Sequence, residues 1–91
     1  MRAEQLDLNL LRVLDALIRT SSVSKAAELL HLSVPATSRA MQRLRSAMHD
    51  PILVRAGRGM VPTPFATSIG ARVRGQLEEI DHLRSDTIGS P

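Results

Sequence analysis

Apolar residues recur three and four positions apart along most of the chain, and this spacing predicts helices. The segment 8–20 (LNLLRVLDALIRT) carries a broad stripe of leucines, and Asp7 precedes it where a helix cap is needed. A polar break follows, and a shorter helix is predicted over 23–30 with Ser22 as its cap. The pattern therefore predicts two helices in the first third of the chain.

A third helix is predicted over 34–48, with Ser33 as its cap. His31 lies in the turn before it, where histidine tolerates the positive φ that often ends a helix. One face of the third helix is predicted to be buried, and it comprises Thr37, Met41, Leu44 and Met48. The opposite face carries Val34, Pro35, Ser38, Arg39, Gln42 and Arg43. Pro35 costs no hydrogen bond there, because the first N–H groups of a helix lack partners within it.

A short hairpin is predicted after the third helix. Residues 52–55 (ILVR) form a β-like run, 56–59 give a turn signal, and 60–62 form a return strand whose proline restricts it to a sheet edge. The hairpin carries two arginines, Arg55 and Arg58. It therefore presents positive charge on a projecting loop.

The last predicted element is a long helix over 63–84, because Thr63 can cap it and the proline after Thr63 suits the first helical position. Its apolar residues form one narrow seam, which comprises Ala66, Ile69, Val73, Leu77 and Ile80. So narrow a seam favours pairing with a second copy of the chain, and packing of the seam on its own domain is the alternative. Residues 85–91 are expected to form a disordered tail.

The composition excludes several classes of protein. The chain has 91 residues, which suits one small domain, and Phe65 is its one aromatic residue, so its core must be aliphatic. It contains no cysteine and therefore has neither disulfides nor thiolate metal sites. No apolar run approaches the ~20 residues of a membrane-spanning helix, and the first ten residues lack the apolar segment of a signal peptide. A cytoplasmic protein is expected.

Positive charge is concentrated in the middle of the chain. The formal net charge is +3, and residues 21–49 carry an excess of three basic residues while residues 63–91 carry an excess of one acidic residue. All but one of the basic side chains are arginines. A guanidinium binds phosphates and guanine edges through two hydrogen bonds at once, which an ammonium cannot do. The middle of the chain therefore suits a nucleic-acid partner.

The predicted elements form a helix-turn-helix followed by a wing. In that arrangement the second helix of the pair enters the major groove of DNA and its first residues meet base edges. Val34 at this position can contact a thymine methyl group, and the small Ala36 lets the backbone come close. We therefore expect a mainly α winged helix-turn-helix, with three helices and a two-stranded wing, over residues 1–62, followed by a linker helix over 63–84.

An ordered series of short runs extends along the chain: KAAELLHLS at 25–33, Pro35-Ala36, Ser38-Arg39, Leu44-Arg45, DPILVR at 50–55, GRG at 57–59 and PTP at 62–64. With these runs, residues 6–84 resemble the N-terminal DNA-binding region of LysR-type transcriptional regulators, in the style of the nodulation-regulator branch. The resemblance implies a domain that dimerises through its long C-terminal helix and binds an interrupted palindrome in promoter DNA as a transcriptional regulator.

The resemblance also implies DNA contacts at the matching positions, which are Ser33, Pro35, Ser38, Arg39, Arg55 and Arg58. We expect Arg39 to read a base edge or to grip the phosphate beside it, with Val34 and Ser38 adding base contacts. Phosphate contacts are expected from Ser33, Arg43, Arg55 and Arg58, and Arg58 can instead probe the minor groove. Gln42 completes the expected DNA-binding set. The expected dimer contacts are Ile69, Val73, Leu77 and Ile80.

Two positions depart from the family pattern. Val34 stands where glutamine is common, so hydrogen bonding to a base is exchanged for apolar contact. Thr37 stands where a larger aliphatic residue is usual, and it either packs less well or bonds back to a helix carbonyl. The effector-sensing domain of the family is not part of this chain, which is either one domain of a longer regulator or a naturally short one. A small-molecule inducer is therefore expected only through a domain absent here.

An enzyme is disfavoured by the residue pattern. The acids of the last helix have no adjacent base, and the histidines (His31, His49 and His82) have neither metal-ligand nor triad spacing, so no catalytic residue, metal or cofactor is expected. Two alternatives stay open, namely a winged-helix module that binds proteins and the DNA-binding domain of another winged-helix family. Steep loss of affinity with salt would indicate DNA rather than an apolar protein partner.

Overall fold

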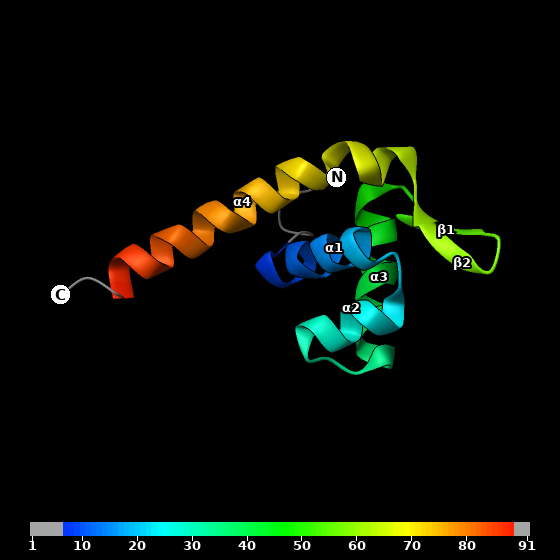
Figure 1. Cartoon of the computed structure of the whole chain (residues 1–91), viewed down its shortest axis with the longest axis horizontal. Helices are drawn as coiled ribbons and strands as arrows, with labels where there is room; N and C mark the ends of the chain where they lie inside the picture. Colours follow the sequence, from blue (N-terminus) through cyan, green and yellow to red (C-terminus); the bar gives the residue numbers. More distant parts are fainter. Residues whose placement is uncertain (1–6, 89–91) are drawn as a thin grey trace.

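The structure, a computed structural model, describes residues 7–88 of the chain. Its elements are, in order, α1 (Leu8–Thr20), α2 (Val23–Leu30), α3 (Val34–Met48), β1 (Leu53–Ala56), β2 (Gly59–Pro62) and α4 (Pro64–Ile88). Figure 1 shows α1, α2 and α3 as a bundle, with the two strands projecting on one side and α4 extending past the other. The predicted winged helix-turn-helix with a long last helix is confirmed.

Side-chain caps begin the first three helices, as predicted. The Asp7 carboxylate accepts a hydrogen bond from the N–H three residues further on, at 2.8 Å. The hydroxyls of Ser22 and Ser33 accept the equivalent bonds, each at 3.2 Å. Each cap satisfies an N–H that no helix carbonyl can reach, so the local sequence sets where these helices begin.

Left-handed residues end the same three helices. Ser21, His31 and His49 have φ values of 54°, 57° and 52° and follow α1, α2 and α3 respectively. The positive φ expected at His31 is therefore observed. Because a left-handed residue turns the chain away from the helix axis, each of these positions reverses the chain toward the next element.

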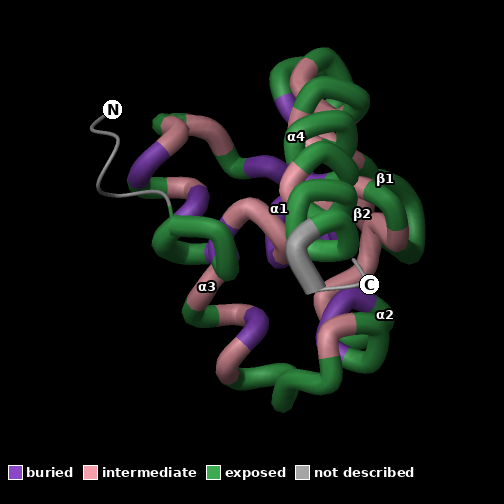
Figure 2. The backbone as a smooth tube through the Cα atoms, turned by 90° about the vertical axis from the view of Figure 1, so that its left-hand side faces the viewer, coloured by how far each residue is buried: buried purple, intermediate pink, exposed green. Residues whose placement is uncertain are grey.

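The core lies where α1 packs against the helix-turn-helix. Leu14 and Leu17 of α1 are completely buried there, as are Leu44 of α3 and Ile52 just before the wing. The core side chains are aliphatic or methionine, and Phe65, the one aromatic residue of the chain, is 39% exposed. Figure 2 shows buried positions within the bundle and exposed positions over most of α4. The expected aliphatic core is confirmed.

The buried face of α3 differs from the prediction at its last position. Thr37, Met41 and Leu44 are buried, as the spacing predicted, but Met48 is half-buried and Ala47 is buried instead. Steps of three and of four both keep a residue on one face of a helix, so the pattern alone allowed either position. Met48, the last residue of the helix, packs at the edge of the core and also borders an open hollow.

The hydroxyl of Thr37 bonds back along the helix. It donates to the backbone carbonyl of Ser33 at 3.0 Å, and Thr37 is completely buried. Its polar group is therefore satisfied in the core, which decides between the two expectations for this position. A buried hydroxyl without a partner would cost free energy, and this contact removes that cost.

The wing is an antiparallel pair with a two-residue turn. Leu53 pairs with Pro62, and the register runs to Ala56 opposite Gly59, so the turn consists of residues 57 and 58. Gly57 is the first central residue of the turn and has φ +60°. A type II′ turn requires a positive φ at this position, and glycine adopts it without strain.

The predicted strand limits were displaced by one residue on each side of the turn. Ile52 was expected to begin the first strand, but its φ is +69°, outside the extended region, and the strand begins at Leu53. The return strand begins at Gly59 rather than at residue 60, because a two-residue turn leaves more of the chain for pairing. Ile52 is completely buried, so its apolar character marks a core position instead of a strand position.

The last helix is longer than predicted. α4 continues to Ile88, whereas the sequence interpretation ended it near 84 and assigned residues 85–88 to a disordered tail. Ser85, Asp86 and Thr87 are weaker helix formers but not helix breakers, and the first glycine or proline after them is at position 89. The helix can therefore propagate through them. The remaining residues of the expected tail, 89–91, lie outside the described residues.

Part of the apolar seam of α4 packs on its own domain. Ala66 and Leu77 are buried, and Ile69 and Val73 are half-buried against the core. Ile80 is half-buried but does not belong to the core cluster. The alternative interpretation therefore holds for the seam from Ala66 to Leu77, and α4 packs against α1.

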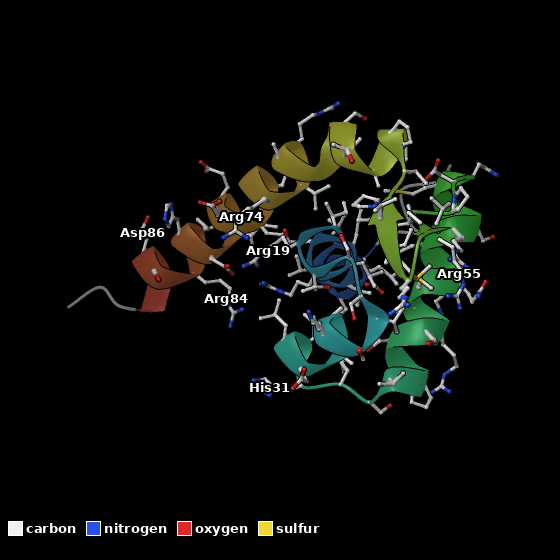
Figure 3. All side chains as sticks on the ribbon, turned by 45° about the vertical axis from the view of Figure 1, so that its right-hand side comes forward. Arg19, His31, Arg55, Arg74, Arg84 and Asp86 are labelled. Atoms are coloured by element: carbon white, nitrogen blue, oxygen red, sulfur yellow. The ribbon has the colours of Figure 1, made fainter. Side chains whose placement is uncertain are left out.

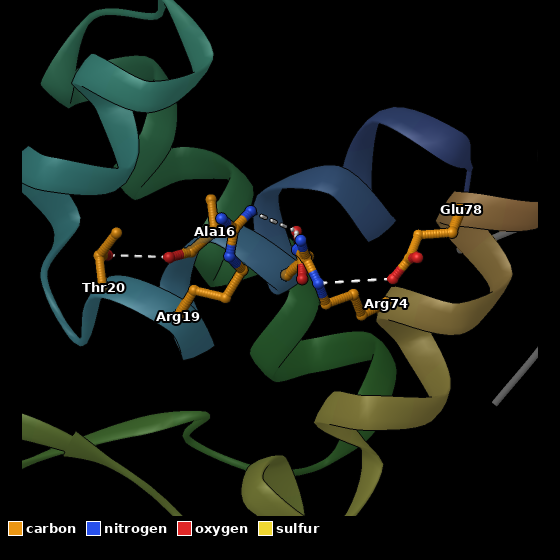
Figure 4. A network of polar contacts seen from close by, with 6 residues as sticks. Ala16, Arg19, Thr20, Arg74 and Glu78 are labelled. Atoms are coloured by element: carbon orange, nitrogen blue, oxygen red, sulfur yellow. Dashed lines mark hydrogen bonds and ion pairs between the residues drawn. The ribbon is translucent and has the colours of Figure 1, made fainter. Parts of the chain in front are cut away.

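Ion pairs also hold α4 against α1. The Arg12 guanidinium donates to the Asp81 carboxylate at 2.9 Å, and this hydrogen bond holds the pKa of Asp81 below its ordinary value. Arg19 and Arg74 approach the Asp15 carboxylate from α1 and α4, at 3.4 and 3.8 Å (Figure 4). The arginines and Asp81 are partly exposed, although Asp15 is only 13% exposed, so each pair contributes modestly to stability and helps to orient α4.

Candidate nucleic-acid interface

The face of α3 opposite the core is open to solvent. Its candidate residues are Val34, Pro35, Ser38, Arg39, Gln42 and Arg43, and all are exposed except Ser38, which is half-buried. They recur at steps of one and three, so they occupy one side of the helix. The structure therefore brings the six predicted contacts of this helix together on one surface.

The start of α3 combines polar and apolar groups. Val34 is 47% exposed, so its apolar side chain is accessible to a ligand. The Ser33 oxygen already accepts the Ala36 N–H, so its hydroxyl hydrogen is what this residue can offer to an acceptor such as a phosphate oxygen. The first N–H groups of a helix also attract anions. This end of α3 can therefore meet a phosphate and an apolar group at once.

The wing places two arginines at its projecting end. Arg58 is the second residue of the turn, and Arg55 pairs across the hairpin with Met60. Both arginines are exposed. Figure 3 shows Arg55 on the side of the molecule opposite Arg84 and Asp86, which lie near the end of α4. The wing therefore extends the positive surface of α3 to one side.

Seven arginines of the described chain differ in whether a carboxylate pairs with them. Within residues 7–88, Arg12, Arg19 and Arg74 form ion pairs with carboxylates of α1 and α4. In the same described range, no carboxylate pairs with the candidate arginines of α3 and the wing, which are Arg39, Arg43, Arg55 and Arg58. Cations without partners on one surface keep their full charge for an anionic ligand.

Arg45 belongs to one of the runs that resemble the family, but the sequence assigned it no role. Its guanidinium donates to the backbone carbonyl of Pro51 at 2.8 Å and to that of Leu53 at 3.3 Å. It therefore bonds the last turns of α3 to the base of the wing. No local signal identifies this role, because the two acceptors are backbone carbonyls that become neighbours only when the chain folds.

Other kinds of site have little support among the described residues. There, no group of three metal-ligating side chains converges, and no helix has the length and apolar character needed to cross a bilayer. An apolar hollow does lie beside α4, lined by Leu11, Met48, Phe65, Ile69 and Val73 together with Arg72 and Gln76. It lies on the seam side of the helix and not on the face of α3 described above.

Residues 8–67 match the family of bacterial regulatory helix-turn-helix proteins of the lysR type. This match covers well over half of the chain. The chain belongs to the LysR family. Its membership agrees with the order of elements, with the exposed face of α3 and with the wing.

The LysR-family relatives are transcriptional regulators. Nodulation protein D 2 of Rhizobium tropici is 45% identical over 80 residues, which are 88% of this chain and 26% of the relative. The transcriptional regulator LinR of Sphingobium indicum is 47% identical over 78 residues, 86% of this chain and 26% of LinR. The chain thus spans about a quarter of the length of these relatives.

Solved structures of the family have the same fold. A probable transcriptional regulator from Pseudomonas aeruginosa superposes with a TM-score of 0.81 at 40% identity, over 87% of this chain and 26% of that one. The DNA-binding domain of BenM, solved in complex with its catB site 1 DNA, gives a TM-score of 0.82 at 28% identity. That match covers 94% of this chain and 99% of the BenM domain. This LysR-family chain therefore corresponds to a DNA-binding domain of the family.

Proposed function

We propose that this chain binds double-stranded DNA in a sequence-specific manner as the DNA-binding part of a transcriptional regulator. α3 lies in the major groove, and the wing contacts the minor groove or the backbone beside it. One observation carries the proposal: Arg39, Arg43, Arg55 and Arg58 lie together on α3 and the wing and lack carboxylate partners within residues 7–88, whereas Arg12, Arg19 and Arg74 are paired. DNA supplies the missing anions as a regular array of phosphates.

The residues of the interface divide by the kind of contact. Arg39 reads a base edge, and Val34 and Ser38 add base contacts near the start of α3. Ser33, Arg43 and Arg55 hold phosphates, and Arg58 reaches a phosphate or the minor groove from the tip of the wing. Phosphate contacts then set position and affinity, while base contacts set the preferred sequence. Pro35 and Gln42 lie on the same face of α3 and complete the surface.

We further propose that two copies pair through α4 and read an interrupted palindrome. Phe65 is 39% exposed and Leu83 is 66% exposed, and the apolar hollow beside Ile69 and Val73 adjoins the same helix. Ile80 is half-buried without joining the core. Leu77, one of the predicted dimer contacts, is buried within its own domain. It therefore cannot contact the second copy directly.

The remaining expectations follow from this role. We propose a cytoplasmic regulator without catalytic activity, metal or cofactor. A small-molecule inducer would bind the part of the relatives that this chain does not match, since the chain spans about a quarter of their length. An inducer is therefore not expected to change the DNA affinity of the 91-residue chain.

Selection from a random duplex pool tests the proposal. The purified chain is incubated with the pool at about 50 mM and about 200 mM salt, and bound duplexes are sequenced. Enrichment of two inverted half-sites, with affinity that falls steeply with salt, is the expected result. Salt-sensitive binding without an enriched sequence would reject base reading, and absence of binding at low salt would favour a module that binds proteins.

A further inference from the structure

The segment between α3 and the wing is held by side chains on two sides. On the α3 side, Arg45 donates through Nε to the Pro51 carbonyl at 2.8 Å and through Nη2 to the Leu53 carbonyl at 3.3 Å. Leu53 is the first residue of β1. A single guanidinium therefore joins α3 to the point at which the wing begins, through two donors whose relative geometry is rigid.

The second restraint comes from Asp50 and Thr63. The Asp50 carboxylate accepts the Ile52 N–H at 2.9 Å and the Thr63 hydroxyl at 2.6 Å. The Thr63 N–H in turn donates to the Ile52 carbonyl at 2.9 Å. Ile52 has φ +69°, a conformation that a β-branched residue rarely adopts, and these bonds at both of its backbone groups hold it there. The base of the wing is thus tied to the start of α4 as well.

The two restraints have different consequences for the wing. The Asp50 and Thr63 contacts join the residues just before β1 to the residue just after β2, so they hold the base of the hairpin together. Arg45 acts from the side, and it lines an open hollow together with Arg55 and Met60 of the wing. Removing Arg45 would therefore free the wing to move relative to α3 while its base stays attached.

We propose that Arg45 is a positioning residue that sets the wing relative to α3, so that Arg55 and Arg58 reach the DNA while α3 occupies the groove. Arg45 acts through the wing arginines and is not itself a principal phosphate contact, because two of its donor groups are engaged by carbonyls of its own chain. This inference rests on the proposed function, since it concerns the same DNA surface.

A double-mutant cycle tests the inference. Arg45→Met removes the guanidinium but keeps an apolar stem, and Arg58→Ala removes the arginine at the tip of the wing. If Arg45 acts through the wing, Arg45→Met weakens binding about tenfold in the parent chain and only about threefold in the Arg58→Ala background, where Arg55 is the wing arginine still to be positioned. Arg45→Lys keeps the charge but not the two-pronged geometry, so it should behave like Arg45→Met.

Arg43→Met is the matched control for the cycle. It removes a cation from the same helix, and among the described residues the Arg43 side chain has no hydrogen bond or ion pair to another residue. We expect its effect to add to that of Arg58→Ala, because two separate phosphate contacts contribute independently. Additive effects for Arg45→Met, or full binding by Arg45→Lys, would show a direct phosphate contact and overturn the inference.

Backbone hydrogen exchange gives a second readout that needs no DNA. Arg45→Met should accelerate exchange of the amides of β1 and β2 while the amides of α1 exchange as in the parent chain. Unchanged exchange in the wing would overturn the inference, and equal acceleration in α1 would reduce Arg45 to a general stabilising residue. Failure of the parent chain to bind DNA would reject the proposed function, and the exchange result would still decide the link between Arg45 and the wing.

Discussion

At the scale of single residues, the chemistry of the candidate interface follows from which groups are left without partners. Arg39 and Arg43 are exposed on α3, and in the described chain neither has a carboxylate partner. Thr37, on the opposite side of the same helix, has its hydroxyl satisfied by the Ser33 carbonyl. Polar groups of the core are thus internally paired, whereas those of the interface remain available to a ligand.

Arg39→Ala should remove sequence preference more than overall affinity. A lost contact to a base edge costs about 1–3 kcal/mol on the preferred duplex and less on unrelated duplexes. Titration of both duplexes at one salt concentration measures the difference. Arg43→Ala, which removes a proposed phosphate contact, should weaken binding to both duplexes similarly. If Arg39→Ala also lowers both affinities by the same factor, Arg39 does not read bases.

Val34→Gln should change which sequence is preferred. The valine is 47% exposed at the start of α3 and offers only apolar contact, whereas glutamine can bond to the edge of adenine. Repeating the selection with this variant measures the change, and its folding should be unaffected because the side chain is not part of the core. The same enriched sequences before and after the substitution would exclude position 34 from base reading.

At the scale of elements, the ends of the helices are set locally but their connections are not. Asp7, Ser22 and Ser33 cap helices through bonds to residues three positions away. Thr63 does this as well, since its hydroxyl oxygen accepts the Ala66 N–H at 3.0 Å, but it also donates to Asp50, thirteen residues earlier. The cap of α4 therefore links that helix to the turn before the wing.

Thr63→Val should destabilise the fold by about 1–3 kcal/mol, because the buried Ala66 N–H loses its acceptor while the side-chain volume hardly changes. Thr63→Ser retains the hydroxyl and is the control, with a much smaller expected loss. Urea denaturation of the two variants measures the difference in unfolding free energy. Equal midpoints for Val and Ser would mean that the hydroxyl contributes nothing to this joint.

At the scale of the whole molecule, the fold separates two surfaces of different character. α3 and the wing carry four exposed arginines (Arg39, Arg43, Arg55 and Arg58) without carboxylate partners in the described chain, and α4 carries a polar exterior around an apolar seam. The described chain measures 51 Å in its longest direction because α4 extends past the bundle (Figure 1). One surface suits DNA, and the extended helix suits a second copy.

Ile80→Asp should convert a dimer to a monomer, because a carboxylate would be buried without a partner at the proposed contact. Sedimentation over a range of concentrations measures the change. Glu79→Ala alters an exposed neighbour and should leave association intact. Leu77→Asp is unsuitable for this test, since Leu77 is buried within its own domain and its loss would unfold the chain. An unchanged sedimentation profile for Ile80→Asp would reject pairing through this part of α4.

The sequence alone determined the features that arise from neighbouring residues. Helix starts, the buried face of α3 up to Leu44, the hairpin and the exposed candidate set on α3 were all predictable, because capping and helical spacing act over three or four residues. The family resemblance rested on such runs too, and the match over residues 8–67 agrees with it.

Only the tertiary structure decided the rest. Ile52 looks like a strand residue but is buried with a positive φ, and Leu77 looks like a dimer contact but is buried within its own domain. Arg45 looks like a surface charge but bonds the base of the wing. In each case the deciding contacts join different elements of the fold. Local spacing specifies which face of an element is apolar or charged, but only the packed fold specifies which neighbour meets that face.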